Sequence, residues 1–213
     1  MRAEIWSDIA CPWCYVGKRR FERALDQFSR RDEVEVTFRA FQLDPGAPVE
    51  RTGSYRELLA SKYGRSPEAA QQMLDQMTET AAAEGLEFRF DLIRPGNTHD
   101  AHRIVGLAAT QKLQEPMKER LMRAYLCEGE LMSDHDTLTR LAAEVGLASD
   151  RVEEVLGSRE FAAEVEAEQE EATVLGITAV PFFAFDRQLG CPGAQPAELM
   201  VSLLEKAWEQ TRA

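Results

Sequence analysis

Two cysteines three positions apart, Cys11 and Cys14, are the residues of this sequence best suited to covalent chemistry. Residues 3–10 predict a buried strand because they are rich in β-branched and aromatic side chains, and residues 15–28 predict an amphipathic helix. Unpaired N–H groups at a helix start stabilise an anion, and a thiol there can have its pKa lowered from about 8.5 to roughly 3.5–7.5. We therefore expect Cys11 to be a nucleophile and Cys14, one turn later, to resolve a mixed disulfide.

Pro12 and Trp13 separate the cysteines and are expected to support this site. Pro12 suits the first helical turn, where the N–H that it lacks would have no partner.

A zinc site is an alternative use of the cysteine pair, but it needs four ligands. The other candidate ligands form no close pair of recognised zinc spacing: Cys127, Cys191, His99, His102 and His135. An inert structural disulfide is a second alternative. The strand–helix setting favours redox chemistry, with no metal and no cofactor beyond a Cys11–Cys14 disulfide.

The composition bounds the class of protein. The chain has 213 residues, 44% of them hydrophobic, which allows a packed core without a disulfide framework. Four cysteines, two of them in one motif, match a reducing compartment. The sequence opens directly into a predicted strand and has no apolar stretch of about 18 residues, so we expect a soluble, cytoplasmic protein. The formal net charge of −12 argues against nucleic acid or an anionic membrane as a partner.

The predicted elements follow the order strand–helix–strand, then a helical block, then strand–strand–helix. Residues 34–41 predict the second strand, and a helical crossover makes it parallel to the first. The pattern stays helical over residues 54–175. Residues 179–185 predict the third strand, with Pro181 near its start, where a missing N–H does least harm. Residues 189–191 predict its antiparallel partner.

This order, with Cys-Pro-Trp-Cys after the first strand and Val180-Pro181 before the third, resembles the thioredoxin fold with a large helical insertion, as in the DsbA family. The predicted fold class is α/β. The thioredoxin-like domain is expected to comprise residues 1–53 and 176–213, and an inserted helical subdomain residues 54–175. Four segments resemble the FrnE-like branch of that family more closely: residues 5–17, 97–103, 180–183 and 193–196. Members of this branch are cytoplasmic DsbA-like oxidoreductases, some of them encoded with polyketide biosynthesis genes.

The resemblance implies a role for each residue of the motif. Cys11 would be the attacking thiol, Cys14 the resolving thiol, and Pro181 the cis-proline that faces the sulfurs. A cis X–Pro bond is uncommon and usually marks a constrained turn. The Val180 backbone would then pair with an incoming extended peptide as a strand does.

The sequence also departs from its relatives. Trp13 stands where DsbA itself carries a histidine, and an indole supplies no positive charge to stabilise the thiolate. We therefore expect a less oxidising disulfide than that of DsbA. Some FrnE-like proteins carry a further C-terminal cysteine pair, whereas Cys127 and Cys191 are single here and are expected to be small hydrophobic residues.

Five further residues are candidates for support of the site. Glu4 and Asp8 lie on or beside the first strand, and either is a candidate for a buried carboxylate of raised pKa that relays protons to the cysteines. Asn97 and Thr98 are expected to cap a helix. A similar Asn-Thr stretch lies near the glutathione site of kappa-class transferases and chromene-carboxylate isomerases, which leaves an active-site role open. His102 is expected to be exposed or hydrogen-bonded in the core.

Three functions compete at this point. The first is a thiol–disulfide oxidoreductase that exchanges disulfides with protein, peptide or glutathione-type thiols, with reduction or isomerisation favoured over oxidation. The second is a glutathione-dependent isomerase or transferase, although those relatives usually have Ser at the first Cys position and lack the resolving Cys. The third is a non-catalytic chaperone that holds peptides near Pro181. A monomer and a homodimer both stay open.

Overall fold

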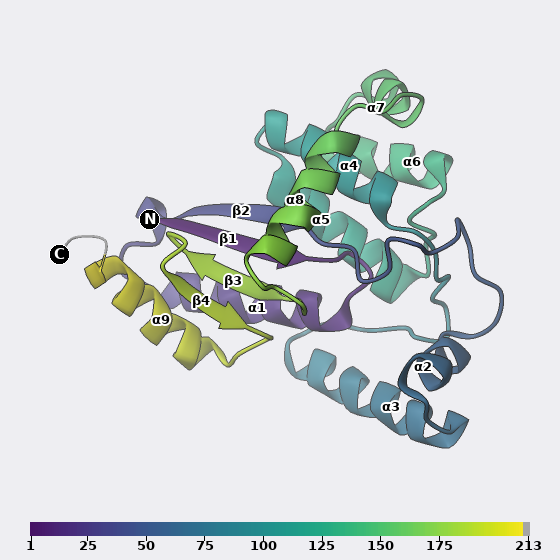
Figure 1. Ribbon diagram of the computed structural model, residues 1–213, viewed down its shortest axis with the longest axis horizontal. Coiled ribbons are helices and arrows are strands. Elements are labelled where there is room, and N and C mark those ends of the chain that lie inside the picture. The colour runs from purple at the N-terminus through teal and green to yellow at the C-terminus, as the bar shows by residue number, and fades with distance from the viewer. Residues whose placement is uncertain (211–213) are drawn as a thin grey trace. The chain divides into compact units, whose positions relative to one another are not determined.

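The structure, a computed structural model, describes residues 1–210 and divides into two compact units (Figure 1). Unit 1 comprises residues 1–43 and the chain from residue 164 onward, and unit 2 comprises residues 44–163. The elements follow the predicted order, and the α/β class with a thioredoxin-like sheet and a helical insertion is confirmed. The elements of unit 1 are β1 (Arg2–Ser7), α1 (Pro12–Gln27), a 3-10 turn (Arg31–Glu33), β2 (Glu35–Ala40), most of α8 (Ala162–Val174), β3 (Phe182–Phe185), β4 (Leu189–Pro192) and α9 (Ala197–Gln210).

A four-stranded sheet in the order β2-β1-β3-β4 forms the centre of unit 1. The crossover through α1 makes β1 and β2 parallel, with Ile5 opposite Phe38. The strand β3 runs antiparallel to β1 and pairs Ile5 with Phe183, and β4 runs antiparallel to β3. The N-terminal strand is therefore a central strand, and its end delivers the chain to the cysteines.

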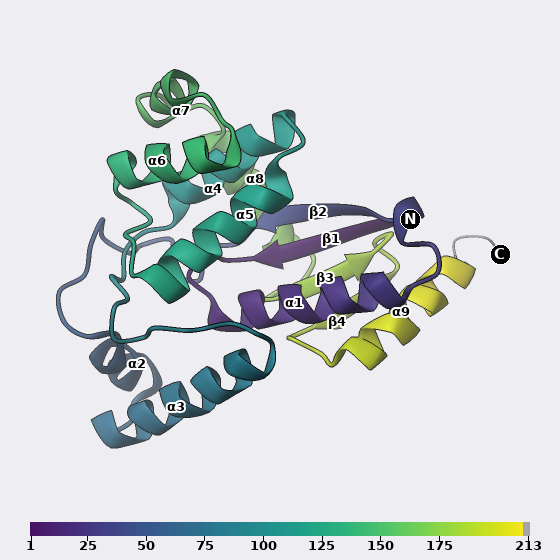
Figure 2. The ribbon, with the colours of Figure 1, turned by 180° about the vertical axis from the view of Figure 1, so that it is seen from behind.

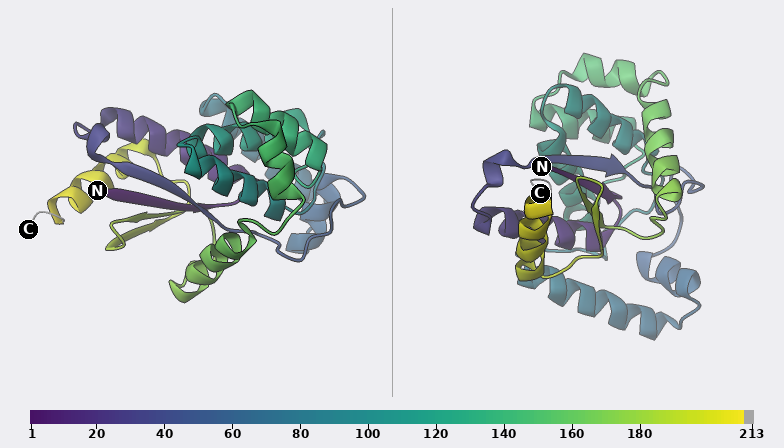
Figure 3. Two further views of the ribbon diagram at one scale, coloured as in Figure 1. Left: turned by 90° about the horizontal axis from the view of Figure 1, so that it is seen from above. Right: turned by 60° about the vertical axis from the view of Figure 1, so that its left-hand side comes forward.

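The two faces of this sheet are covered by different helices (Figures 1, 2 and 3). Alternate residues of β1 point to opposite faces, which puts Ala3 and Ile5 on one side and Glu4 and Trp6 on the other. The first face packs against apolar residues of α1 and α9. The second face packs against the end of α8, where Trp6 meets a small cluster that contains Ala172 and Ile177.

Two strand boundaries differ from the sequence prediction by three residues, and the other boundaries differ by one residue at most. The strand β1 ends at Ser7 rather than Ala10, because the chain turns at Asp8: the Asp8 carbonyl accepts the N–H of Cys11 at 3.3 Å, and its carboxylate accepts the N–H of Ala10 at 3.4 Å. The strand β3 begins at Phe182, directly after Pro181, rather than at residue 179. Both corrections shorten the strands at the ends where the site lies.

Unit 2 is helical, as the sequence predicts. Its elements are α2 (Tyr55–Tyr63), α3 (Pro67–Ala83), α4 (His99–Thr110), α5 (Gln114–Arg123), a π-helical turn (Ala124–Glu128), α6 (His135–Val145) and α7 (Ser149–Leu156). Helix α4 packs against α5, α6 and α7, and α2 packs against α3. The side chains of Ser54 and Ser66 accept backbone N–H groups at the starts of α2 and α3, and Asp134 does so for α6.

The unit boundaries lie at 43/44 and 163/164, whereas the sequence placed them at 53/54 and 175/176. Residues 44–53 join unit 2 through backbone bonds, among them Arg51 N–H to Pro95 O at 2.7 Å. Helix α8 lies mostly in unit 1 because its side chains bond β2: Glu168 accepts the N–H of Ala40 at 2.6 Å. Helical periodicity locates a helix but not the surface on which it packs.

Among the residues described, no helix is both long and apolar enough to cross a membrane.

Candidate active site

The two cysteines lie at the beginning of α1. Cys11 is the N-cap residue in an extended conformation, and Pro12 occupies the first helical turn as expected. The Cys11 carbonyl accepts the N–H of Cys14 at 3.0 Å, which brings the two residues close together. Both are thiols and almost fully buried, with 4% and 2% of their surfaces exposed, whereas Trp13 between them in the sequence is 48% exposed. The start of α1 thus holds two buried thiols one turn apart and one exposed indole.

The segment before β3 faces these thiols. Cys11 Sγ lies 3.7 Å from the carbonyl oxygen of Val180, so the thiol is placed to donate to it. The Val180–Pro181 peptide bond is cis, Pro181 is buried, and the Pro181 carbonyl accepts the N–H of Gly193 at 2.8 Å. The backbone of Val180 and the thiol of Cys11 therefore meet at one place.

Gly17 on α1 completes the site, and the sequence interpretation did not single it out. A Cβ built on Gly17 would lie 2.9 Å from Cγ of Pro181 and 3.4 Å from Cβ of Ala194. Only a residue without a side chain lets Pro181 pack this close to α1. The signal was present in the sequence, because a glycine inside a helix costs about 0.5–1 kcal/mol relative to alanine and so needs a reason.

Asp8 lies beside the cysteines with its carboxylate fully buried. One oxygen accepts the N–H of Leu43 at 2.8 Å, and the other faces the N–H of Ala10 at 3.4 Å. These bonds join the end of β1 to the chain that leaves β2. Asp8 therefore shapes the turn that leads into Cys11, and its role as a proton relay stays a prediction.

Glu4 is buried on β1, but its environment contradicts the raised pKa expected of a proton relay. Arg187 donates to both of its oxygens, at 2.6 and 2.8 Å, and Arg39 donates to Oε1 at 2.6 and 2.9 Å. The hydrogen bonds from Arg187, joined by those from Arg39, outweigh burial and lower the pKa of Glu4 to about 2. Glu4 is therefore a permanent anion that binds two guanidinium groups.

Asn97, Thr98 and His102 belong to unit 2, whereas both cysteines belong to unit 1. Asn97 Oδ1 accepts the N–H of His99 at 2.7 Å at the start of α4, and its amide donates to the carbonyl oxygens of Ala47 and Pro45. Thr98 occupies the N-cap position, but no bond from its side chain caps the helix. The capping expected of the pair is thus made by Asn97, and His102 is buried in α4 rather than exposed.

Burial raises the pKa of both single cysteines. Cys191 is buried on β4 opposite Phe183, and burial raises the pKa of its thiol. Cys127 is half-buried in the π-helical turn, and burial raises the pKa of that thiol to about 11. Both are neutral thiols at physiological pH, as expected of small hydrophobic residues.

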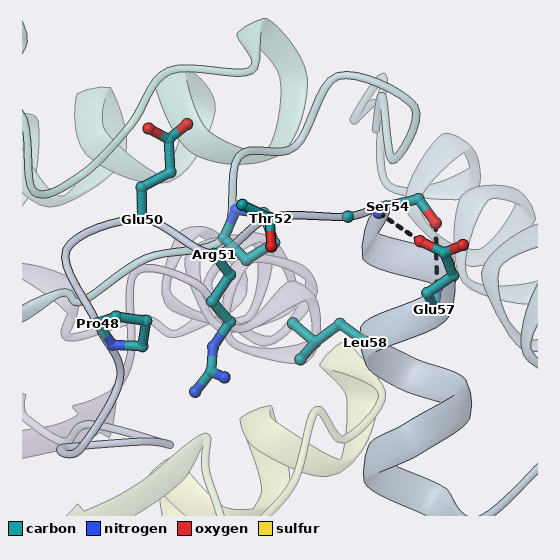
Figure 4. Close-up of a pocket in the computed structure, with 9 residues that line it drawn as sticks. Pro48, Glu50, Arg51, Thr52, Ser54, Glu57 and Leu58 are labelled. Carbon is teal, nitrogen blue, oxygen red and sulfur yellow. Dashed lines mark hydrogen bonds between the residues drawn. The ribbon is translucent and has the colours of Figure 1, made fainter.

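Unit 2 contains a pocket of about 440 Å³ lined by Pro48, Glu50, Arg51, Thr52, Gly53, Ser54, Glu57, Leu58 and Pro95 (Figure 4). Its charged groups already have partners. Glu57 and Ser54 bind each other's N–H groups in the capping box of α2, Glu50 pairs with Arg94, and Arg51 pairs with Asp44. None of the residues predicted from the sequence for the site lines this pocket.

A family model described as a DSBA-like thioredoxin domain matches residues 2–205. The chain belongs to this family. The solved structure of a probable DsbA oxidoreductase from Streptomyces coelicolor has a TM-score of 0.94 and 44% identity, and the match covers 98% of this chain and 90% of that one. The predicted membership of the DsbA family is confirmed.

Two further relatives of this DSBA-like chain have lower sequence identity to it. The uncharacterized protein YwbO of Bacillus subtilis is 28% identical over 182 residues, which are 84% of each chain. The cytosolic disulfide reductase DsbM of Pseudomonas aeruginosa shares the fold at 17% identity and a TM-score of 0.68, over 99% of this chain and all of that one, and has also been solved with GSH. DsbA-like proteins are disulfide oxidoreductases or isomerases, and the Cys11 and Cys14 thiols of this chain fit that chemistry.

Proposed function

We propose that this protein is a cytoplasmic thiol–disulfide oxidoreductase of the FrnE-like branch, which reduces or isomerises disulfides with Cys11 and Cys14. One observation supports this most strongly: Cys11 Sγ lies at the N-terminus of α1, 3.7 Å from the carbonyl of Val180, with Cys14 one turn further along. A thiolate at Cys11 would lie where the N–H groups of the first turn point, and a substrate could reach it past Trp13.

The reaction proceeds through two exchanges. The Cys11 thiolate attacks one sulfur of the substrate disulfide, the second substrate sulfur leaves as a thiolate and takes a proton from water, and a mixed disulfide forms. The Cys14 thiolate then attacks Cys11 Sγ and releases the first substrate sulfur. Two electrons pass from the dithiol to the substrate, and the Cys11–Cys14 disulfide is left.

The backbone of Val180 would orient the substrate during the first exchange. Its carbonyl faces the sulfur of Cys11, so an extended peptide paired with residue 180 would bring its own disulfide to the same sulfur. A thiol of the glutathione type would restore the dithiol, with two thiols oxidised to one disulfide. The DsbM structure with GSH supports this class of electron donor.

A pair of assays tests this proposal against the two alternatives. The protein should reduce insulin or a peptide disulfide in the presence of glutathione, and Cys11→Ser should abolish turnover because it removes the attacking thiol. A glutathione-dependent transferase would instead conjugate glutathione to an electrophile at a substantial rate. A peptide-binding chaperone would be inactive in both assays, and either of these results would reject the proposal.

A further inference from the structure

The surface between α8 and the sheet holds a polar network that the proposed reaction does not use. Glu168 is its central residue on α8. One carboxylate oxygen accepts a hydrogen bond from Arg39 Nη1 at 2.8 Å, and the other accepts the backbone N–H of Ala40 at 2.6 Å. The carbonyl of Glu168 accepts the indole N–H of Trp6 at 3.3 Å. One residue of α8 thus bonds to β1 and β2 together.

This network lies at the free edge of the sheet, because β2 is an edge strand. The N–H of Ala40 ends that strand, and the N–H of Gln42 beyond it donates to Oε1 of the next α8 residue, Gln169, at 2.6 Å. Side chains of α8 therefore take the place that a further strand would occupy. Charge-assisted bonds of this kind are about twice as strong as neutral ones, so they fix α8 firmly on β2.

The end of α8 leads directly to the segment that faces Cys11. Gly176 closes the helix with a φ of +72°, and the N–H of Ile177 returns to the carbonyl of Ala172 at 2.8 Å. Ile177 is buried beside Trp6, and only residues 178 and 179 separate it from Val180. The position of α8 therefore determines where the segment begins that places Val180 beside the thiol of Cys11.

We propose that Glu168 is a positioning residue, which acts through α8 to hold the Val180 carbonyl at Cys11. The strand β1 carries Trp6 and leads to Cys11, and α8 leads to Val180, so both partners of the 3.7 Å contact start from the same network. The inference rests on the proposed function, since it assigns Glu168 to the peptide-binding side of that site. It predicts a loss of peptide-disulfide exchange with little effect on the reactivity of the thiol itself.

The test compares Glu168→Ala with Glu170→Ala. Glu170 is an exposed acid on the same helix, so its replacement is a matched control. Amide hydrogen exchange of Ile177 and Gly193, whose N–H groups bond to Ala172 and Pro181, is measured together with peptide-disulfide turnover and the rate at which iodoacetamide alkylates Cys11. In Glu168→Ala we expect exchange at these amides to rise about tenfold, kcat/KM for the peptide to fall about tenfold, and alkylation to change less than about twofold. The control should match the parent protein.

Amides of β1, such as that of Ile5, show whether the variant only loosens the unit. Equal acceleration there, or unchanged exchange at Ile177 and Gly193, would overturn the proposal. If Glu168→Ala does not fold, Glu168→Gln serves instead, since it keeps an oxygen for the N–H of Ala40 and loses the charge that faces Arg39. If the parent protein reduces no disulfide, the proposed function fails, and the amide exchange still decides whether Glu168 holds the segment.

Discussion

Pro181 packs against Gly17 so closely that a methyl group on residue 17 would lie 2.9 Å from the proline ring. This contact joins the helix that presents the cysteines to the segment that faces them. Two contacts meet there: the thiol of Cys11 with the carbonyl of Val180, and the ring of Pro181 with the backbone of α1. The first prediction follows from this contact.

Gly17→Ala should reduce both stability and peptide-disulfide turnover. The substitution would gain about 0.5–1 kcal/mol as a helix residue, but overpacking against a rigid ring costs about 1–3 kcal/mol. We expect a net loss of about 1 kcal/mol in the free energy of unfolding, measured by urea denaturation. Peptide turnover should fall more than the rate of alkylation of Cys11, because the segment 180–181 must move. A more stable variant with full turnover would mean that Pro181 has free room at this position.

The stability of the protein in acid should depend on Glu4. Its pKa is about 2 in the folded protein and close to 4.5 when unfolded, so ionised Glu4 stabilises the fold above pH 4.5. This contribution, on the order of 2–3 kcal/mol, should disappear as the pH falls from about 4.5 to about 2. Urea denaturation at several pH values measures it.

Glu4→Gln should remove this part of the pH dependence and lower the stability at pH 7 by about 3 kcal/mol, because Arg39 and Arg187 lose their shared anion. The exposed Glu170→Gln should leave the pH profile unchanged. An identical acid profile for Glu4→Gln and the parent protein would contradict the ionic role of Glu4.

The local parts of the site could be predicted from the sequence pattern. Of the distant parts, Val180 and Pro181 could be predicted only through the resemblance to the DsbA family, and the partners of Glu4 could not be predicted. Cys11, Pro12 and Cys14 lie close together in the sequence at a strand–helix junction, so the local sequence pattern was sufficient to predict where they lie. The partners of Glu4 lie 35 and 183 positions away, and burial alone suggested a raised pKa where two arginines lower it. The same limit applies to α8, because its helical pattern does not show that Glu168 bonds to the edge strand.

Trp13→His should make the Cys11–Cys14 disulfide more oxidising. An imidazole can donate a hydrogen bond to, or carry positive charge beside, the thiolate of the reduced form, and an exposed indole cannot. Stabilising the reduced form raises the reduction potential, and we expect about 30 mV, a tenfold change in the equilibrium constant. Equilibration with glutathione buffers measures the potential, and Trp13→Phe is the control for loss of the indole alone. A potential equal to or below that of the parent protein would show that residue 13 does not act on the thiolate.

The central claim is that Cys11 attacks and Cys14 resolves, and trapping the intermediate tests it most directly. Cys14→Ser is incubated with a peptide disulfide, and the products are analysed by intact-mass spectrometry and peptide mapping. The account predicts one stable mixed disulfide per chain, at Cys11, because the first exchange proceeds and the second cannot. No adduct, an adduct at Cys127 or Cys191, or full turnover by the Cys14→Ser variant would contradict the two-thiol mechanism.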